Sequence, residues 1–526
     1  MFLLKDMDAK KSFPIGVLEH EEAWEFFKKI AGDGVESSDL LPIATEVAKK
    51  CGGLPIAIST LATSLRNEPP FVWKDALRQL SKPSSSNFKG VPGSVYSTIE
   101  WSYDRLQSED HKQTFLLCSL LGHNLHLEFL LMCAMGIGLF HGVSTVEETR
   151  NRLLTVVSHL KASCLLLDGY NNLRLDMHDL ISDVATSIAA NHVFVLRRED
   201  VLNDWPDDET MKECDKISLL FPSMNKLPGQ LKCPKLTLFN MDCVDPLMKI
   251  PANFFEKMKN LKALSLYGMN LPYLPSSISL LPNLRTLCLY RCVLGDIALI
   301  GELKNLEILS FDGSDIELLP EEIGQLTKLK WLDLTGCSKL KKIPPGVICK
   351  LSRLEELYVD DSTLFQLKAL FPNLEKLKLS LTNIERIWFP QAFCSTQKLK
   401  KLIIKGYTNL KHVLSDSMVE YLQQLECLKI SECKCIQEII STENIIEEAF
   451  RNRYLICFPR LNTIKLKGLK KLIGFCHEDY TVKFPSLKTL EIESCPKLKG
   501  FIHNSKSKEI PTDAVFFNNK VLFSTQ

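Results

Sequence analysis

A short apolar frame recurs through the second half of the chain, and no other feature limits the possible folds as strongly. In each copy, apolar residues occupy the first, fourth and sixth positions, as do Leu261, Leu264 and Leu266. The first residues of the ten copies are separated by 23, 22, 23, 25, 20, 25, 26, 36 and 26 positions. A period of about 20–29 residues predicts a stack of small units rather than one globular core. The frames begin at Leu261, Leu284, Leu306, Leu329, Leu354, Leu374, Leu399, Leu425, Leu461 and Leu487.

Each frame is expected to be a short strand whose leucines point inward. No single repeat can bury that apolar face alone, so neighbouring repeats must stack on one another. The pattern predicts an α/β leucine-rich-repeat solenoid over residues 231–500. Residues 196–230 would form a linker or first capping repeat, and 501–526 an irregular tail. The longest interval contains the polar stretch from Ser441 to Asn452, which we interpret as a loop insertion.

The first 195 residues are expected to be α-helical. One helical pattern stops at Gly52-Gly53, and Pro55 stands where the next helix would begin. A loop rich in Ser, Pro and Gly from Ser81 to Gly93 marks a subdomain boundary. Beyond it, the segment around Cys164–Leu175 could form a small hairpin among helices. We therefore predict a helical subdomain over 1–90 and a winged-helix-like subdomain over 91–195.

Composition and charge narrow the classes of function. The 64 Lys and Arg residues nearly cancel the 63 Asp and Glu residues, so no global field favours nucleic acid or an anionic membrane. The longest uncharged apolar run, Phe129 to Phe140, has 12 residues, whereas a membrane-spanning helix needs about 20. Eighteen cysteines without tight paired spacing, and no secretory leader, favour reduced thiols. A cytoplasmic protein with no membrane span and no sequence-specific nucleic-acid binding is expected.

Some of the cysteines follow the repeats. Cys292, Cys337, Cys433 and Cys495 each lie three positions after the last apolar residue of a frame, where they are expected to pack into the turn. A metal site that uses Cys433 and Cys435 is an alternative. It lacks a further His or Cys pair at zinc-ligand spacing, so the packing role is favoured.

Two motifs in the first half carry a family resemblance. Gly53-Leu54-Pro55-Ile56-Ala57 resembles the GLPLA motif, and Met177-His178-Asp179-Leu180 resembles the MHD motif, of plant NB-ARC leucine-rich-repeat disease resistance proteins of the coiled-coil class. Glu22-Ala23-Trp24 and Trp101–Leu106 are similar to further fragments of that family. The order of these motifs, followed by repeats, fits the family over most of the chain.

The resemblance implies a nucleotide switch. In the family, the proline matching Pro55 packs near the adenine, and the histidine matching His178 reaches the β-phosphate of ADP through a charge-assisted hydrogen bond. The aspartate matching Asp179 helps to hold the resting state closed. Without the resemblance, His178 is a lone histidine before a helix and Asp179 an ordinary N-cap.

The sequence departs from the family in its phosphate-binding residues. No Gly-x-x-x-x-Gly-Lys-Ser/Thr occurs, so the nest of N–H groups and the lysine that hold phosphates are lacking. The chain is expected to begin after the family's P-loop, as an N-terminally truncated form. ADP or ATP is therefore expected in full-length relatives and not in this chain. Leu357–Asp361 mimics a strand ending in two acids, but it falls on the fifth frame and is interpreted as repeat surface.

Charges divide along the expected concave face of the solenoid. Positions three, five and seven of each frame should point outward onto this face, where such proteins bind partners. The first five frames place aromatic and acidic residues there, and the next four place lysines. The alternative is a merely solvated surface. The candidate partner-binding residues are Tyr267, Tyr290, Trp331, Asp333, Tyr358, Lys376, Lys378, Lys401, Lys405, Lys429, Lys465 and Lys467.

These observations favour recognition over catalysis. His-Glu-x-x-His and Gly-x-Ser-x-Gly are both absent from the sequence, so an enzyme is disfavoured. The preferred interpretation is an intracellular plant immune receptor without the P-loop half. Its repeats would bind a pathogen effector or a guarded host protein, and its lysines an acidic surface, such as a nucleotide-binding module. The alternative is a leucine-rich-repeat scaffold or decoy without nucleotide switching. A ligase substrate receptor would also use such repeats, but no adaptor-binding motif is recognisable.

Overall fold

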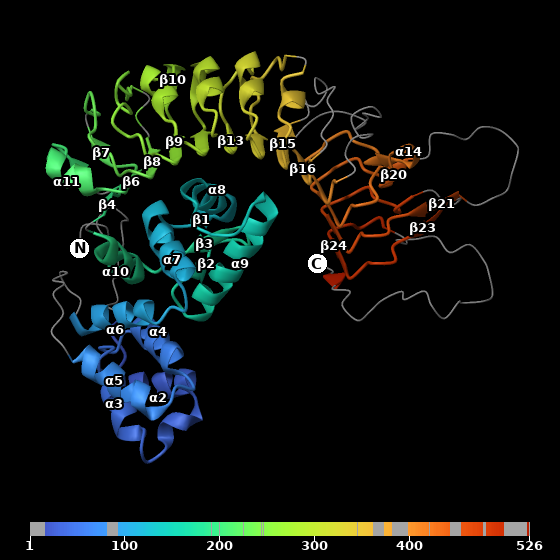
Figure 1. Cartoon of the computed structure of the whole chain (residues 1–526). Coiled ribbons are helices and arrows are strands. Elements are labelled where there is room, and N and C mark those ends of the chain that lie inside the picture. Colours follow the sequence, from blue (N-terminus) through green and yellow to red (C-terminus); the bar gives the residue numbers. More distant parts are fainter. Residues whose placement is uncertain are drawn as a thin grey trace, which may run out of the picture. The chain divides into compact units, whose positions relative to one another are not determined.

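The computed structural model describes residues 16–81, 93–360, 373–380, 398–441, 454–498 and 523–524, apart from positions 191, 199, 225, 244, 246, 345, 420 and 477–479. The chain divides into two compact units, each described by itself (Figure 1). The first comprises Met1–Ala134, Gly138–Val143 and Glu148–Val195, and the second Met135–Ile137, Ser144–Glu147 and Leu196–Gln526. Among the described residues, no helix is long and apolar enough to cross a membrane.

The first unit is built mainly from helices. A capping box between Glu19 and Glu22 starts α2, and this helix buries Ala23, Phe27 and Ala31 at helical spacing. The Phe27 ring meets the buried Trp73 of α5 edge to face, with 6.0 Å between ring centroids. The helices are α2 (His20–Ala31), α3 (Leu41–Lys49), α4 (Pro55–Leu65), α5 (Pro70–Leu80), α6 (Gly93–Asp104), α7 (Glu109–Leu121), α8 (Leu127–Ile137), α9 (Val146–Ala162) and α10 (Asp179–Ala189).

A small antiparallel sheet lies among the later helices, in the strand order β1-β3-β2. Strands β2 (Leu167–Asp168) and β3 (Arg174–Asp176) form the expected hairpin, and β3 also pairs with β1 (Leu125–His126). This pairing brings the loop before β1 beside Asp176, which precedes the MHD-like motif.

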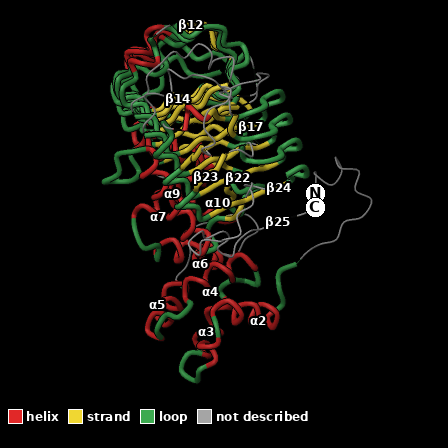
Figure 2. Tube along the Cα trace, turned by 90° about the vertical axis from the view of Figure 1, so that its right-hand side faces the viewer, coloured by secondary structure: helices red, strands yellow, loops and turns green. Residues whose placement is uncertain are grey.

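The second unit is dominated by one 14-stranded sheet. The recorded pairs from β6 to β25 are parallel, and the strands stack side by side in chain order (Figure 2). The fourth-position leucines face each other across the strands: Leu264 aligns with Leu287, and Leu332 with Leu357. All four are fully buried, which confirms the predicted solenoid of stacked repeats following a helical region.

Three strands of this sheet, β4, β6 and β8, precede the first of the ten frames. Strands β6 and β8 pair with each other, and β8 pairs with β9. Ile217 on β6 and Phe239 on β8 are buried and align with the frame leucine Leu264, so these strands continue the same apolar frame. The strands of the sheet are β4 (Val193–Leu196), β6 (Lys216–Leu220), β8 (Leu238–Asp242), β9 (Ala263–Tyr267), β11 (Thr286–Tyr290), β13 (Ile308–Ser310), β14 (Trp331–Leu334), β15 (Glu356–Asp360), β16 (Lys376–Ser380), β17 (Lys401–Lys405), β19 (Cys427–Ser431), β22 (Thr463–Lys467), β24 (Thr489–Glu493) and β25 (Phe523–Ser524).

The segments between the strands of the large sheet include turns, short 3-10 helices and short strands that pair in four two-stranded sheets, such as β10 (Asn270–Tyr273) with β12 (Val293–Asp296). Prolines are tolerated there because no ladder hydrogen bond is lost. Pro275 and Pro320 precede the 3-10 helices Ser276–Leu280 and Glu321–Gln325. The predicted loop insertion after Ser441 lies outside the described residues.

Candidate functional site

The register of the sheet arranges the outward residues of the frames in three rows, which together are called the concave face below. The third positions form one row, in which Lys376 is followed by Lys401 and then Cys427. The fifth positions form the second, and the seventh positions the third. Each row therefore carries side chains from successive repeats at the strand spacing of about 4.8 Å.

The aromatic part of this face is less accessible than predicted. Trp331, Asp333 and Tyr358 are each at most 5% exposed, and the rings of Trp331 and Tyr358 lie edge to face at 5.2 Å. The expectation that these three offer exposed contact surface is wrong for this structure, because the sequence shows which face a residue takes but not what covers it. Their contact with a partner stays a prediction. Tyr267 and Tyr290 are half-buried, and Arg291 donates to the Tyr267 hydroxyl at 3.2 Å.

A buried polar cluster marks the change of charge sign along the face. Glu356 on β15 aligns with Lys376 on β16, and their side chains form an ion pair at 3.3 Å. The Tyr358 hydroxyl donates to Glu356 at 2.9 Å and contacts the Lys376 ammonium, which lies 4.7 Å from the Tyr358 ring centroid. Lys376 is only 6% exposed. This lysine is therefore part of the buried structure rather than open surface.

A short segment of the second unit contacts the strand starts beside this cluster. Lys330 donates to the Ser144 carbonyl at 2.7 Å, and the Val146 N–H donates to Glu355 at the same distance. Burial raises the pKa of Glu355 to about 7, and neighbouring carboxylates add to the rise. Sequence reasoning missed this glutamate, because it lies at the second position of its frame.

The remaining lysines lie on strands β16 to β22 and are called the lysine patch. Its members are Lys378, Lys401, Lys405, Lys429, Lys465 and Lys467. Lys405 and Lys467 are exposed and the other four half-buried. Lys378 lies 4.8 Å from the Tyr358 ring centroid, and Lys401 pairs with Glu147 of the same unit at 2.5 Å.

The tenth frame limits the lysine patch. On β24, Glu491 aligns with Lys465 and Glu493 with Lys467, and the pairs form ion pairs at 2.6 and 3.0 Å. Lys405 lies 3.6 Å from Glu432. The alignment of fifth and seventh positions could have shown these partners from the sequence, because the tenth frame has the same spacing as the ninth.

Asp242 lies in the third row, between Leu220 on β6 and Tyr267 on β9, and was also missed. It ends β8 and aligns with Tyr267 on β9. Burial raises the pKa of this carboxyl from 3.8 to about 7. The folded chain therefore holds a proton on Asp242 more tightly than the unfolded chain does.

This shift predicts how stability depends on pH. Because the folded state binds the extra proton, the contribution of Asp242 to stability is largest below about pH 4 and is lost as the pH rises towards about 7. Asp242→Asn should remove that decline, so the difference between wild type and variant in urea unfolding should change between pH 5 and 7.5. Parallel stability curves for the two proteins would contradict the assignment.

The repeat cysteines occupy the turns as expected. The Cys292 thiol donates to the Leu266 carbonyl at 3.5 Å, and the Cys337 thiol to the Phe311 carbonyl at 3.3 Å, one repeat back in each case. Cys292, Cys337 and Cys433 are buried, and burial raises the pKa of Cys292 and of Cys433 to about 11. Among the described residues, no cluster of three His, Cys, Asp or Glu side chains could hold a metal.

This packing predicts the reactivity of the thiols. In the native chain at pH 8, Cys292, Cys337 and Cys433 should resist a thiol-specific disulfide reagent because all three are buried, and for Cys292 and Cys433 burial also disfavours the reactive thiolate. The exposed Cys349 is the internal control and should react at once. Peptide mapping after labelling measures each site, and equal labelling of Cys337 and Cys349 before unfolding would contradict the packing role.

The MHD-like motif lies at the start of α10. The His178 ring caps this helix, since its Nδ1 accepts the Leu180 N–H at 3.1 Å. The residues alone suggested Asp179 as the N-cap of this helix, but in the structure the N-cap is His178. His123 contacts both neighbouring carboxylates, with Nδ1 2.9 Å from Asp176 and Nε2 3.4 Å from Asp179. His178 and Asp179 are both exposed.

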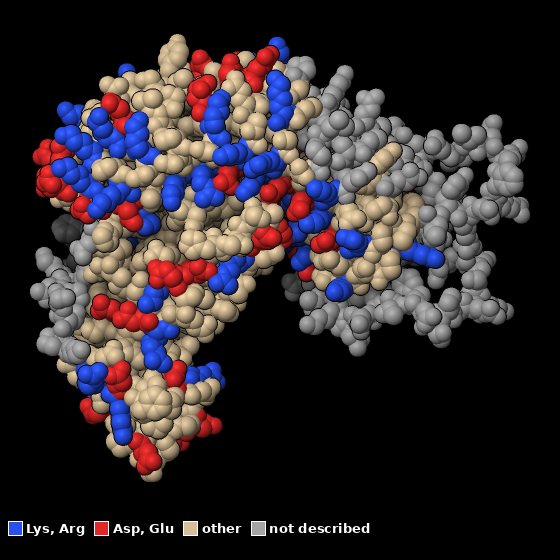
Figure 3. All heavy atoms as spheres, viewed as in Figure 1, with Lys and Arg blue, Asp and Glu red and all other residues tan. Residues whose placement is uncertain are grey.

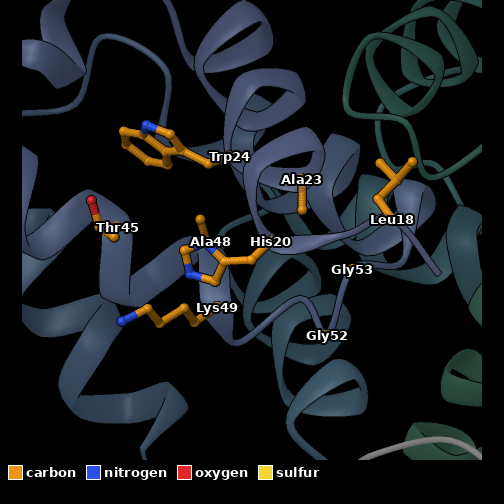
Figure 4. A pocket seen from close by; sticks show the side chains of 9 residues that line it. All are labelled: Leu18, His20, Ala23, Trp24, Thr45, Ala48, Lys49, Gly52 and Gly53. Atoms are coloured by element: carbon orange, nitrogen blue, oxygen red, sulfur yellow. The ribbon is translucent and has the colours of Figure 1, made fainter.

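The GLPLA-like motif starts α4. Gly53 has φ +71°, and a β-carbon there would lie 2.4 Å from the Leu18 carbonyl oxygen, so only glycine fits. Pro55 is the exposed first residue of the helix. A cavity of about 230 Å³ lies beside the motif, and Figure 4 shows the side chains around it. Its lining includes Gly52, Gly53, Trp24, His20 and Lys49.

These residues do not by themselves fit a nucleotide. Pro55 does not line the cavity, and Nδ1 of His178 is engaged by its own helix. The sequence supplies no glycine-rich loop with a lysine to hold phosphates. Pro55 and His178 alone therefore do not supply the hydrogen-bond donors and positive charge that the phosphate groups of a nucleotide require.

Several known proteins are similar to this chain over part of its length. Residues 373–510 match the family model of RPS2-like plant disease resistance protein leucine-rich repeats. A probable disease resistance protein of Arabidopsis thaliana is 29% identical over 55% of this chain and 32% of its own length. A second Arabidopsis disease resistance protein is 30% identical over 68% of this chain and 37% of its own. A solved leucine-rich-repeat protein of Leptospira interrogans, 20% identical, covers 59% of this chain and 92% of its own at a TM-score of 0.29.

The fold and the family model define the chain as a leucine-rich-repeat protein. More particularly, it is a relative of plant disease resistance proteins, which confirms the resemblance carried by its motifs. The chain spans about a third of the length of the curated relatives it matches.

Proposed function

We propose that this chain is the partner-recognising part of an intracellular plant immune receptor of the nucleotide-binding leucine-rich-repeat type. The observation that carries the proposal is the combination, in one chain, of the two switch-like motifs with a sheet of repeats in continuous register. Its relatives are disease resistance proteins. The partner is a pathogen effector or a guarded host protein on the concave face, in the cytoplasm. No catalytic step is involved.

The defence role has a genetic test. A plant line without this gene should lose resistance to at least one pathogen isolate. Wild-type chain should restore resistance, whereas a variant with Tyr290→Ala and Lys378→Glu on the concave face should not. A line that keeps full resistance across a broad pathogen panel, or equal rescue by the variant, would refute the proposal.

The nucleotide part of the switch is proposed to be incomplete in this chain. In a complete relative, partner binding would release a closed ADP-bound state as a shift between two populations. By the family resemblance, Pro55 and His178 of this chain would contact a bound nucleotide. Among the described residues, no glycine-rich loop with a lysine is present to bind its phosphates. Isothermal titration should detect no ADP or ATP binding, and micromolar affinity would refute this.

A scaffold or decoy without nucleotide switching is the second candidate. It is favoured by the lack of a Gly-x-x-x-x-Gly-Lys-Ser/Thr sequence among the 526 residues. Transcript sequencing separates the two functions: a P-loop encoded in frame upstream of Met1 supports the receptor, and its absence supports the scaffold.

A further inference from the structure

Like charges lie side by side in the lysine patch, which a stability requirement alone does not explain. Lys429 on β19 aligns directly with Lys465 on β22. Like charges on neighbouring strands destabilise a sheet. Burial raises the pKa of the Cys427 thiol, and Lys429, Lys401 and Lys465 act against that rise, so all three ammonium groups act on one point of the face.

The patch has defined ends. Towards the N-terminus, the Lys376 ammonium is neutralised by buried Glu356. Towards the C-terminus, Lys465 forms an ion pair with Glu491, and Lys467 forms one with Glu493. Between these ends, no carboxylate of the described residues lies within ion-pair distance of Lys378 or Lys429. Positive charge is therefore left over in the middle of the patch, on strands β16 to β19.

The residue types on these strands indicate which ligand the charge would attract. The outward positions of β16, β17, β19 and β22 hold Lys, Ser, Thr, Cys and one Ile, with no arginine and no aromatic residue. Binding of single-stranded nucleic acid relies on aromatic stacking, and phosphate recognition favours arginine. Among the described residues, no large apolar side chain is exposed on these strands, so nothing would insert into a lipid surface. Lysines as point charges suit separate carboxylates.

The contact of Lys401 shows the same chemistry. Its ammonium pairs at 2.5 Å with Glu147, which lies 254 positions away in sequence and outside the repeats. A carboxylate brought from a non-repeat segment is thus already accommodated at one edge of the patch. The net charge of the chain is near zero, so such attraction is local. On the face drawn in Figure 3, acidic and basic side chains lie next to one another.

We propose that the middle of the lysine patch, centred on Lys378 and Lys429, binds an acidic segment of a partner protein through its Asp and Glu carboxylates. This inference rests on the proposed function, in which the repeats bind a partner protein. It adds that the partner presents an acidic segment to the lysine patch. The charge of Lys429, which lies beside Lys465, is retained at some expense of stability because the partner's carboxylates offset it.

The direct test uses the full chain and short poly-L-glutamate as the probe. Wild type should bind the probe, with affinity that falls as salt rises. The double variant Lys378→Glu/Lys429→Glu should bind at least about tenfold more weakly, since two attractions become repulsions. Lys470→Glu, an exposed turn lysine off the three rows, makes the same change of charge per site and should leave affinity unchanged.

Stability provides a second readout that separates recognition from a structural role. Lys429→Gln removes one of two aligned ammonium groups, so it should leave the unfolding free energy unchanged or slightly higher while it weakens probe binding. A structural lysine would instead lose stability on this change.

Three results would overturn the inference. They are equal probe binding by the double variant and wild type, tighter binding of a single-stranded oligonucleotide than of poly-L-glutamate, and tighter binding of phosphatidylserine vesicles. The inference and the proposed function can fail separately. If the double variant loses probe binding but the chain has no effect on pathogen resistance, the acidic-segment site is supported and the proposed function is refuted.

Discussion

Leu332→Ala is expected to lower the free energy of unfolding by about 2–5 kcal/mol. Leu332 is fully buried on β14, where it aligns with Leu309 on one side and Leu357 on the other. Truncation removes apolar contacts and leaves a cavity between three stacked repeats, which can collapse only partly. Urea unfolding followed by circular dichroism measures the loss.

Leu318→Ala is the matched control for this substitution. The same side chain is removed from a neighbouring repeat, but Leu318 is 47% exposed. A surface substitution of this kind usually changes stability by no more than about 0.5 kcal/mol. Similar losses for Leu332 and Leu318 would contradict the inward orientation of the frame leucines.

Lys376→Met is expected to destabilise the chain by about 3–5 kcal/mol. The substitution keeps the length of the side chain but removes the ammonium that pairs with Glu356, which is only 2% exposed. An unpaired carboxylate would remain buried, and the Tyr358 hydroxyl alone would be left to stabilise it. Thermal and urea unfolding should both show the loss.

The double variant Glu356→Leu/Lys376→Met tests the cause. When both charges of a buried pair are replaced by apolar groups of similar volume, the result is often neutral or stabilising. The double variant should therefore recover most of the stability that Lys376→Met loses. A double variant as unstable as the single one would show that the cost comes from packing rather than from the buried carboxylate.

Much of the solenoid could be predicted from the sequence, because apolar residues at fixed spacing leave few ways to bury them. The frames at Leu264 and Leu287 place those leucines in aligned, buried positions, as the structure confirms. The strands β6 and β8 lie before the ten frames, within the predicted capping repeat and solenoid, and their residues Ile217, Phe239 and Met241 fill the same inward positions as the frame leucines. Burial depends on hydrophobicity and volume, so these strands also fit the apolar frame and could have been counted from the sequence.

The candidate site was predictable only in part. Period-two alternation assigns Trp331, Tyr358 and Lys376 to the concave face, and the register bears that out. These side chains contact one another across neighbouring strands, and such contacts between repeats are not contained in the pattern of a single frame. The acidic partners of Lys465 and Lys467 were within reach of the sequence, because the next frame repeats the spacing and carries Glu491 and Glu493.

The most direct test of this account is the rate at which an amine-specific reagent labels each lysine of the folded chain, followed by mass spectrometry. Stacked repeats with this register predict fast labelling of exposed Lys405 and Lys467 and slow labelling of buried Lys376. With poly-L-glutamate present, Lys378 and Lys429 should become protected and Lys470 should not. Labelling of Lys376 as fast as Lys405 would contradict the repeat register, and protection confined to lysines off the three rows would contradict recognition on the concave face.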